Sequence, residues 1–141
     1  MNQDGSINIL VLGGLFQGSD INVNFVGQES AGNKLGEKRV RLIHVNLIQE
    51  IPKDSDFDLI IGVLPNLKRS FHEHRMEMIN RAIKMHPTVP VILYSWINPK
   101  NHKEIMEYAK KIGAQIEFCA ASLCVKVRTL FFPQDFIWDE D

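Results

Sequence analysis

The chain has 141 residues, of which 45% are hydrophobic and 23% are charged, and its formal net charge is −1. This length and composition are typical of one globular domain, and they exclude a disordered chain, which would have fewer apolar residues and more net charge. The near-neutral balance also argues against a dedicated nucleic-acid-binding protein, because such a protein needs a basic face to displace counterions from phosphates.

The cysteine pattern and the hydropathy indicate a cytoplasmic protein. Cys119 and Cys124 match neither a CxxC motif nor a zinc pattern, and two thiols without a disulfide framework suit a reducing compartment. The chain opens with polar residues, and no apolar run approaches the ~20 residues that a membrane span requires. We therefore expect no membrane association.

Five short segments predict the strands of a mostly parallel sheet. Three of them are almost wholly apolar, as in strands buried on both faces, and one alternates between two faces. In chain order the predicted strands are Ile7–Leu12, Val40–Leu47, Phe57–Leu64, Val91–Tyr94 and Gln115–Cys119. The glycine-containing stretch between residues 15 and 38 predicts a loop-rich segment with one short strand or a frayed helix.

Two helices have clear start signals. Ser70 and Glu73 fit a capping box, and an apolar stripe with helical spacing follows them. Asn98 and Pro99 fit the cap and the first position of the next helix, which Gly113 ends. The segment Leu123–Phe131 has both helical and strand spacing, and we favour a helix because it would complete the alternation of strands and helices.

The alternation predicts right-handed βαβ units and an open sheet. The expected fold is a single flavodoxin-like α/β three-layer sandwich with about five mostly parallel strands and an irregular first crossover. The domain would span residues 1–132, followed over residues 133–141 by an acidic tail that carries Phe136 and Trp138. In such sheets functional groups lie beyond the carboxyl ends of the strands.

The order of elements resembles that of response-regulator receiver domains. Residues 57–61 followed by Pro65 are similar to the receiver third strand, and residues 89–95 to the fourth, with Ser95 in the place of the hydroxyl residue. Ile112–Ala114 and Val125–Phe131 also fit the pattern. The resemblance covers residues 7–132 and implies a CheY-like fold in a regulatory protein.

The residues that carry receiver chemistry do not match. Receivers hold Mg²⁺ with acids after the first strand, where this chain has Gly13 and Gly14. They accept phosphate on an aspartate at the end of the third strand, where this chain has Gly62–Leu64, and use a lysine after the fifth, where Cys119 stands. The resemblance therefore implies a pseudo-receiver, for which we expect no catalytic residue, no metal and no cofactor.

Our leading hypothesis is a non-catalytic regulatory or assembly module that acts through a protein partner or through self-association. The predicted contact surface comprises the second clear helix, the fifth strand and the last helix, with Trp96, Tyr108 and Lys111 as candidate partner-binding residues.

The alternative is a small-molecule or nucleotide-binding domain, with or without enzymatic activity, built on the glycine-rich turn after the first strand. That turn matches neither GxGxxG nor a P-loop. The candidate ligand-binding residues are Gly13, Gly14, Gly18, Ser19, Asn66, Lys68, Ser95 and Asn98.

Overall fold

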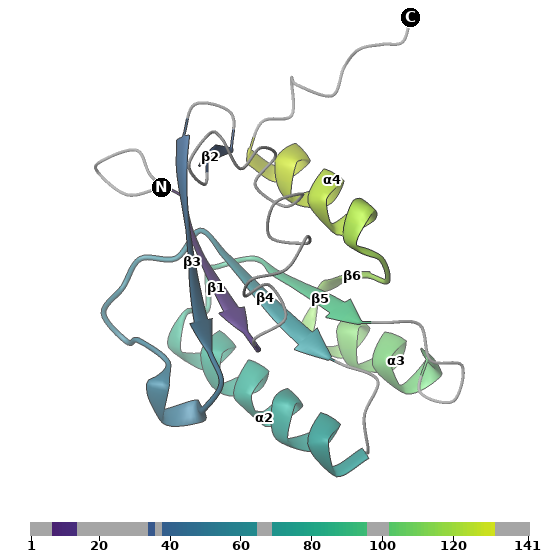
Figure 1. Cartoon of the computed structure of the whole chain (residues 1–141). Coiled ribbons are helices and arrows are strands. Elements are labelled where there is room, and N and C mark those ends of the chain that lie inside the picture. The colour runs from purple at the N-terminus through teal and green to yellow at the C-terminus, as the bar shows by residue number, and fades with distance from the viewer. Residues whose placement is uncertain (1–6, 14–33, 36–37, 65–68, 96–101, 132–141) are drawn as a thin grey trace, which may run out of the picture.

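Strands and helices alternate along the chain in the computed structural model, which describes residues 7–13, 34–35, 38–64, 69–95 and 102–131 (Figure 1). The strands are β1 (Ile7–Leu12), β2 (Lys34–Leu35), β3 (Lys38–Val45), β4 (Leu59–Leu64), β5 (Val91–Ser95) and β6 (Gln115–Glu117). The helices are α2 (Arg69–Met85), α3 (His102–Ile112) and α4 (Ala120–Phe131), with a short 3-10 turn, η2 (Ile48–Glu50), after β3.

The strands form one sheet in the order β2-β3-β1-β4-β5-β6. All neighbouring pairs are parallel except β2 with β3, so the core of the sheet is the predicted set of five parallel strands. Strand β1 lies between β3 and β4, and the strand order reverses there. Sheets of this type have their topological switch point at the carboxyl ends of the two strands on either side of the reversal, here β1 and β4.

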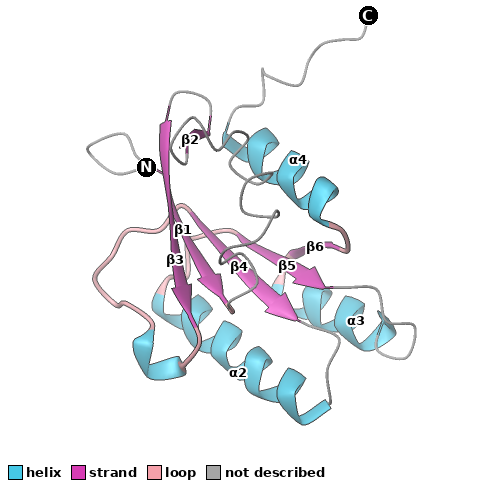
Figure 2. Ribbon diagram, in the orientation of Figure 1, coloured by secondary structure: helices cyan, strands magenta, loops and turns pink. Residues whose placement is uncertain are grey.

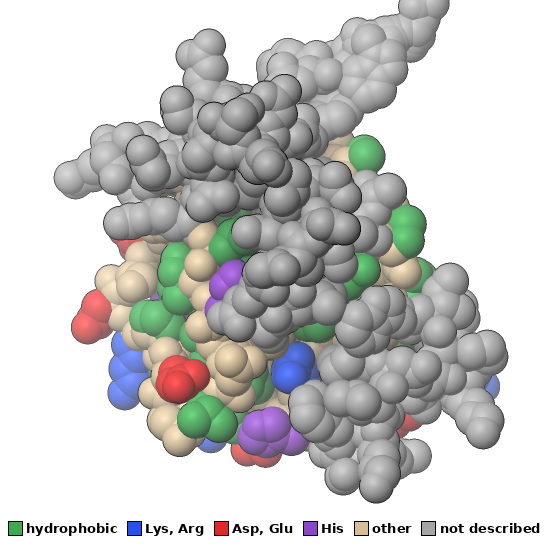
Figure 3. All heavy atoms as spheres, viewed as in Figure 1, with side chains coloured by type: hydrophobic (Ala, Val, Ile, Leu, Met, Phe, Trp, Pro, Cys, Tyr) green, Lys and Arg blue, Asp and Glu red, His purple; other side chains and the backbone are tan. Residues whose placement is uncertain are grey.

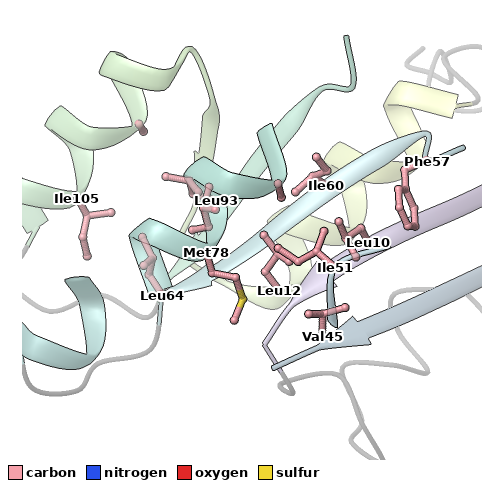
Figure 4. Packing of buried hydrophobic residues seen from close by; sticks show 13 residues of the cluster. Leu10, Leu12, Val45, Ile51, Phe57, Ile60, Leu64, Met78, Leu93 and Ile105 are labelled. Carbon is pink, nitrogen blue, oxygen red and sulfur yellow. The ribbon is translucent and has the colours of Figure 1, made fainter. Parts of the chain in front are cut away.

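Helices cover both faces of the sheet, as Figure 2 shows, with α2 and α3 on one face and α4 on the other. On the first face, side chains of the strands pack against α2 and α3 in a cluster seen in Figure 4. That cluster contains Leu10, Leu12, Val45, Ile60, Leu64, Met78, Ile79, Ala82, Leu93, Ile105 and Ala109, among others.

On the second face, Leu123 and Val127 of α4 pack against the alternate residues of the same strands. Successive side chains of a strand point to opposite faces, so Ile9 and Val11 belong to this cluster while Leu10 and Leu12 belong to the other. Two apolar clusters separated by one sheet make a three-layer sandwich, and the fold predicted from the sequence is confirmed.

Some local predictions are corrected. Helix α2 begins at Arg69, so Ser70 lies inside its first turn and cannot cap it, and the predicted capping box is wrong. The segment Leu123–Phe131, whose spacing fitted both a helix and a strand, belongs to the helix α4, as we favoured. The predicted helix start at Asn98 and most of residues 15–38 lie outside the described residues.

Gly62, in the middle of β4, lets α2 approach the sheet closely. A Cβ atom at this position would lie 2.6 Å from Cδ1 and 2.8 Å from Cγ1 of Ile79. Real Cβ atoms do not come this close to other atoms, so a side chain here would push α2 away from β4.

Gly62→Ala should therefore lower the free energy of unfolding by roughly 1–3 kcal/mol, measured by urea titration. Ile79→Val removes Cδ1, the nearer of the two Ile79 atoms that the new methyl group meets, so the double variant should be more stable than the sum of the two single effects. The matched control is Gly113→Ala, where no atom lies within 4 Å of the new Cβ, and which should be additive with Ile79→Val. Strict additivity at Gly62 would contradict the packing of α2 on β4.

Candidate functional site

The side chain of Arg75 from α2 reaches the carboxyl ends of β1 and β4, at the switch point. Its Nη1 atom donates hydrogen bonds to the carbonyl oxygens of Leu12 (3.2 Å) and Val63 (2.6 Å). Arg75 is only 7% exposed. One buried guanidinium thus joins two neighbouring parallel strands to the helix that packs beneath them.

Gly13 makes room for this guanidinium. A Cβ atom at position 13 would lie 2.5 Å from Nη1 of Arg75 and 3.1 Å from Cβ of Val63. The backbone of Gly13 also has φ +131°, a conformation that side chains disfavour. Its amide donates to the carbonyl oxygen of Val45 (2.8 Å), which extends the pairing of β1 with β3 by one hydrogen bond.

Arg75 places a cation at the described part of this edge. Burial lowers the pKa of Arg75 because the charged form loses hydration, but a guanidinium stays protonated in proteins at neutral pH. Hydrogen bonds from a charged donor are stronger than neutral ones, and those to the two carbonyls offset part of the desolvation.

Ser95, a candidate ligand residue, lies at the same edge. It is fully buried, and its hydroxyl donates to the carbonyl oxygen of Leu64 (2.8 Å), the residue paired with it on β4. Ser95 and Gly13 are thus both placed at the carboxyl ends of the strands, as predicted. The other candidate ligand residues, Gly14, Gly18, Ser19, Asn66, Lys68 and Asn98, lie outside the described residues, and the ligand site stays a prediction.

Of the candidate partner-binding residues, Tyr108 packs between two helices. Its hydroxyl lies 3.1 Å from the carbonyl oxygen of Met76 and 2.7 Å from Oδ1 of Asn80, both on α2. Burial raises the pKa of Tyr108 to about 12. Lys111 is exposed in the last turn of α3, whereas Trp96 lies outside the described residues, so their roles in binding stay predictions.

Helices α3 and α4 carry exposed apolar side chains that the sequence analysis did not single out. Met106 on α3 is 43% exposed, and Val125 and Leu130 on α4 are 51% and 39% exposed. Both helices contact β6, the last strand of the sheet. We call these three residues the β6-side apolar set. Elsewhere, on the described part of the face in Figure 3, side chains of both charges are interspersed.

Cys119 stands immediately before α4 with an exposed thiol. The backbone amide of Ser122 donates to its Sγ atom (3.5 Å), and the Ser122 hydroxyl donates to its carbonyl oxygen (3.1 Å). These contacts belong to the start of the helix. Within the described ranges, no three His, Cys, Asp or Glu side chains are grouped so that they could hold a metal ion.

Arg75 is a site residue that the sequence analysis missed, although a signal was present. It precedes Met78, Ile79 and Ala82 by three, four and seven residues, which places it on the apolar stripe of α2. An arginine on a buried stripe needs hydrogen-bond partners, and the ends of the neighbouring strands provide them. As for membranes, the helices in the described part of the chain are too short or too polar to cross one.

Solved structures with the same arrangement are response-regulator proteins. A response regulator from Thermotoga maritima superposes with a TM-score of 0.55 at 18% identity, over 89% of this chain and 97% of that one. A receiver domain protein (CheY-like) from Methanospirillum hungatei JF-1 gives 0.55 at 14% identity, over 92% and 97%. No protein-family model and no curated protein matches the sequence.

A third structure, described as a novel family of redox sensors in the streptococci that evolved from two-component response regulators, gives a TM-score of 0.57 at 15% identity. The match covers 94% of this chain but 54% of that one, so this chain spans about half of the streptococcal protein.

The sheet order and the two helical layers define a doubly wound α/β domain of the flavodoxin-like class. Within that class the chain has the receiver fold, as the resemblance in its sequence implied.

Tyr108→Phe should lower the free energy of unfolding by about 1 kcal/mol at neutral pH, because the hydrogen bonds to α2 are lost. The folded-state pKa of Tyr108 lies above its ordinary value of 10.0, so its contribution is complete below pH 10 and is lost as the pH rises through about 12. Urea titrations at several pH values should therefore show the wild-type protein losing more stability than the variant over this range. If the free energies of unfolding of the wild type and the variant changed in parallel with pH, the raised pKa of Tyr108 would be contradicted.

Proposed function

We propose that this receiver-like domain is a non-catalytic regulatory or assembly module, a pseudo-receiver that acts through protein–protein contacts. One observation carries the proposal: the guanidinium of Arg75 fills the switch point at the ends of β1 and β4. In open α/β sheets that position is where ligands and substrates bind. Here a side chain of the same domain takes it.

The chemistry at this edge opposes phosphoryl transfer to the domain. That reaction needs a carboxylate to accept the phosphoryl group and a divalent cation to neutralise its charge. The positive charge of Arg75 adds to the cost of binding a divalent cation where carboxylate ligands are lacking. Gly13, where the receiver pattern has an acid, supplies no carboxylate.

The structural neighbours support a regulatory role. One is a response regulator, and another is described as a redox sensor that evolved from response regulators. A receiver fold that signals without phosphorylation is thus consistent with the second description. We expect the protein in the cytoplasm, as its cysteine usage suggests.

The contact surface that we propose is formed by α3, β6 and α4. Exposed apolar side chains beside a sheet edge favour association, and the β6-side apolar set lies on the two helices that flank β6. Lys111 lies on the same helix as Met106 and would contribute to a polar rim. Trp96 remains a candidate anchor by sequence alone.

Incubation with acetyl phosphate and Mg²⁺ should leave the intact mass and the melting temperature unchanged, because Gly13 and residues 62–64 supply no carboxylate to hold Mg²⁺ or to accept the phosphoryl group. A ligand present at 100 times its dissociation constant adds about 2.7 kcal/mol, which moves the midpoint by several degrees. A covalent phosphoryl adduct would refute the non-catalytic proposal. A shift with nucleotides or sugar phosphates would instead favour the alternative ligand-binding function of the glycine-rich turn.

Val125→Asp and Leu130→Asp together should abolish self-association in sedimentation experiments, or capture of a partner in pull-downs, because a buried carboxylate in an interface is costly. Leu47→Asp is the matched control, because Leu47 is 46% exposed but follows β3, which lies toward the opposite edge of the sheet from β6. Equal behaviour of the two variants would remove α4 from the proposed surface.

A further inference from the structure

Two carbonyl groups near the ends of β1 and β4, those of Leu12 and Val63, converge on a single nitrogen atom. Leu12 is the final residue of β1, and Val63 precedes the final residue of β4. We infer that these two carbonyls form a cation-binding site for a guanidinium group, which Arg75 fills from within and which holds β1, β4 and α2 in one fixed arrangement. The inference uses the same Arg75 contacts that carry the proposed function, but it stands whichever surface binds a partner.

The carbonyl groups at this end of the strands favour a cation. Carbonyl oxygens point out of the carboxyl end of a parallel strand, and a buried carbonyl needs a donor. The amide of Gly13, which could have received an anion, donates to Val45 instead. The groups that face Nη1 of Arg75 in the described structure are therefore acceptors, with oxygen-to-nitrogen distances of 3.2 Å and 2.6 Å.

The shape of the site fits a guanidinium group. Nη1 carries two hydrogens in a fixed plane, so one nitrogen can serve a carbonyl from each strand. Gly13 leaves the space that the nitrogen occupies, since a Cβ atom there would be 2.5 Å away. Gly62 allows α2 to lie close to β4 at Ile79, which is one helical turn beyond Arg75. Figure 1 shows α2 passing beneath the ends of both strands.

The site should be demonstrable by chemical rescue. Arg75→Ala should lower the melting temperature by several degrees, and millimolar guanidinium should restore part of that loss by binding between the two carbonyls. Wild-type protein and Arg75→Met, whose side chain fills the space without charge, should show no gain from guanidinium. Urea and sodium chloride at the same concentrations are the controls for solvent and ionic-strength effects, and neither should rescue Arg75→Ala.

Rescue by guanidinium but not by urea would support the site. An Arg75→Ala variant that responds to guanidinium as the wild type does would overturn it, as would an Arg75→Met variant with wild-type stability. Loss of partner binding on α4 changes none of these results, so failure of the proposed function and failure of this inference are distinguishable.

A second measurement uses the unmodified protein and does not depend on whether Arg75→Ala folds. Side-chain NMR should show that the Nη hydrogens of Arg75 exchange with water at least tenfold more slowly than those of Arg81. Arg81 lies on the same helix and is exposed, which makes it the matched internal reference. Equal exchange rates for the two guanidinium groups would overturn the inference.

Discussion

A positive charge is buried at the ends of two parallel strands, and it constrains the position of the neighbouring helix and the residues that pack there. The Arg75 guanidinium loses hydration on burial, and the carbonyls of Leu12 and Val63 replace part of it through hydrogen bonds from Nη1, while Nε has no hydrogen-bond partner among the described residues. This contact requires α2 to lie close to the sheet, which Gly62 permits. It also requires that the residue after β1 has no side chain, which Gly13 satisfies. The two glycines therefore meet requirements of one arginine.

This arrangement changes what the carboxyl edge of the sheet can do. In doubly wound folds that edge recognises ligands because its loops are free to present polar groups. Here an internal side chain fills the switch point, and the hydroxyl of Ser95 donates to Leu64 within the sheet. The hydroxyl of Ser95 and the carbonyl groups of Leu12 and Val63 therefore stabilise the edge, and helices α3 and α4 are the surfaces that we propose for recognition.

The fold could be predicted because its signals are local and repeated. Near-continuous apolar runs identify β1 and β4. The last segment fitted both periods, and the alternation of strands and helices favoured the helix, whose Leu123 and Val127 form its buried side. Arg75 was missed for a different reason. A single charged residue within an apolar stripe is usually assigned to the exposed side of a helix, and its partners are backbone carbonyls, which the sequence does not reveal. The boundary at Ser70 failed because capping signals locate helix ends only to within a residue or two.

The glycine after β1 shows why a glycine motif alone does not reveal which charge its backbone faces. A glycine at the end of a first strand fits both an amide cradle for an anion and a space for a neighbouring side chain. The two possibilities differ in the direction of the amide, which the sequence cannot show. In this domain the Gly13 amide faces the carbonyl of Val45, while the carbonyl of Leu12 faces the guanidinium. At this glycine the strand end therefore presents acceptors, and a cation is the complementary charge.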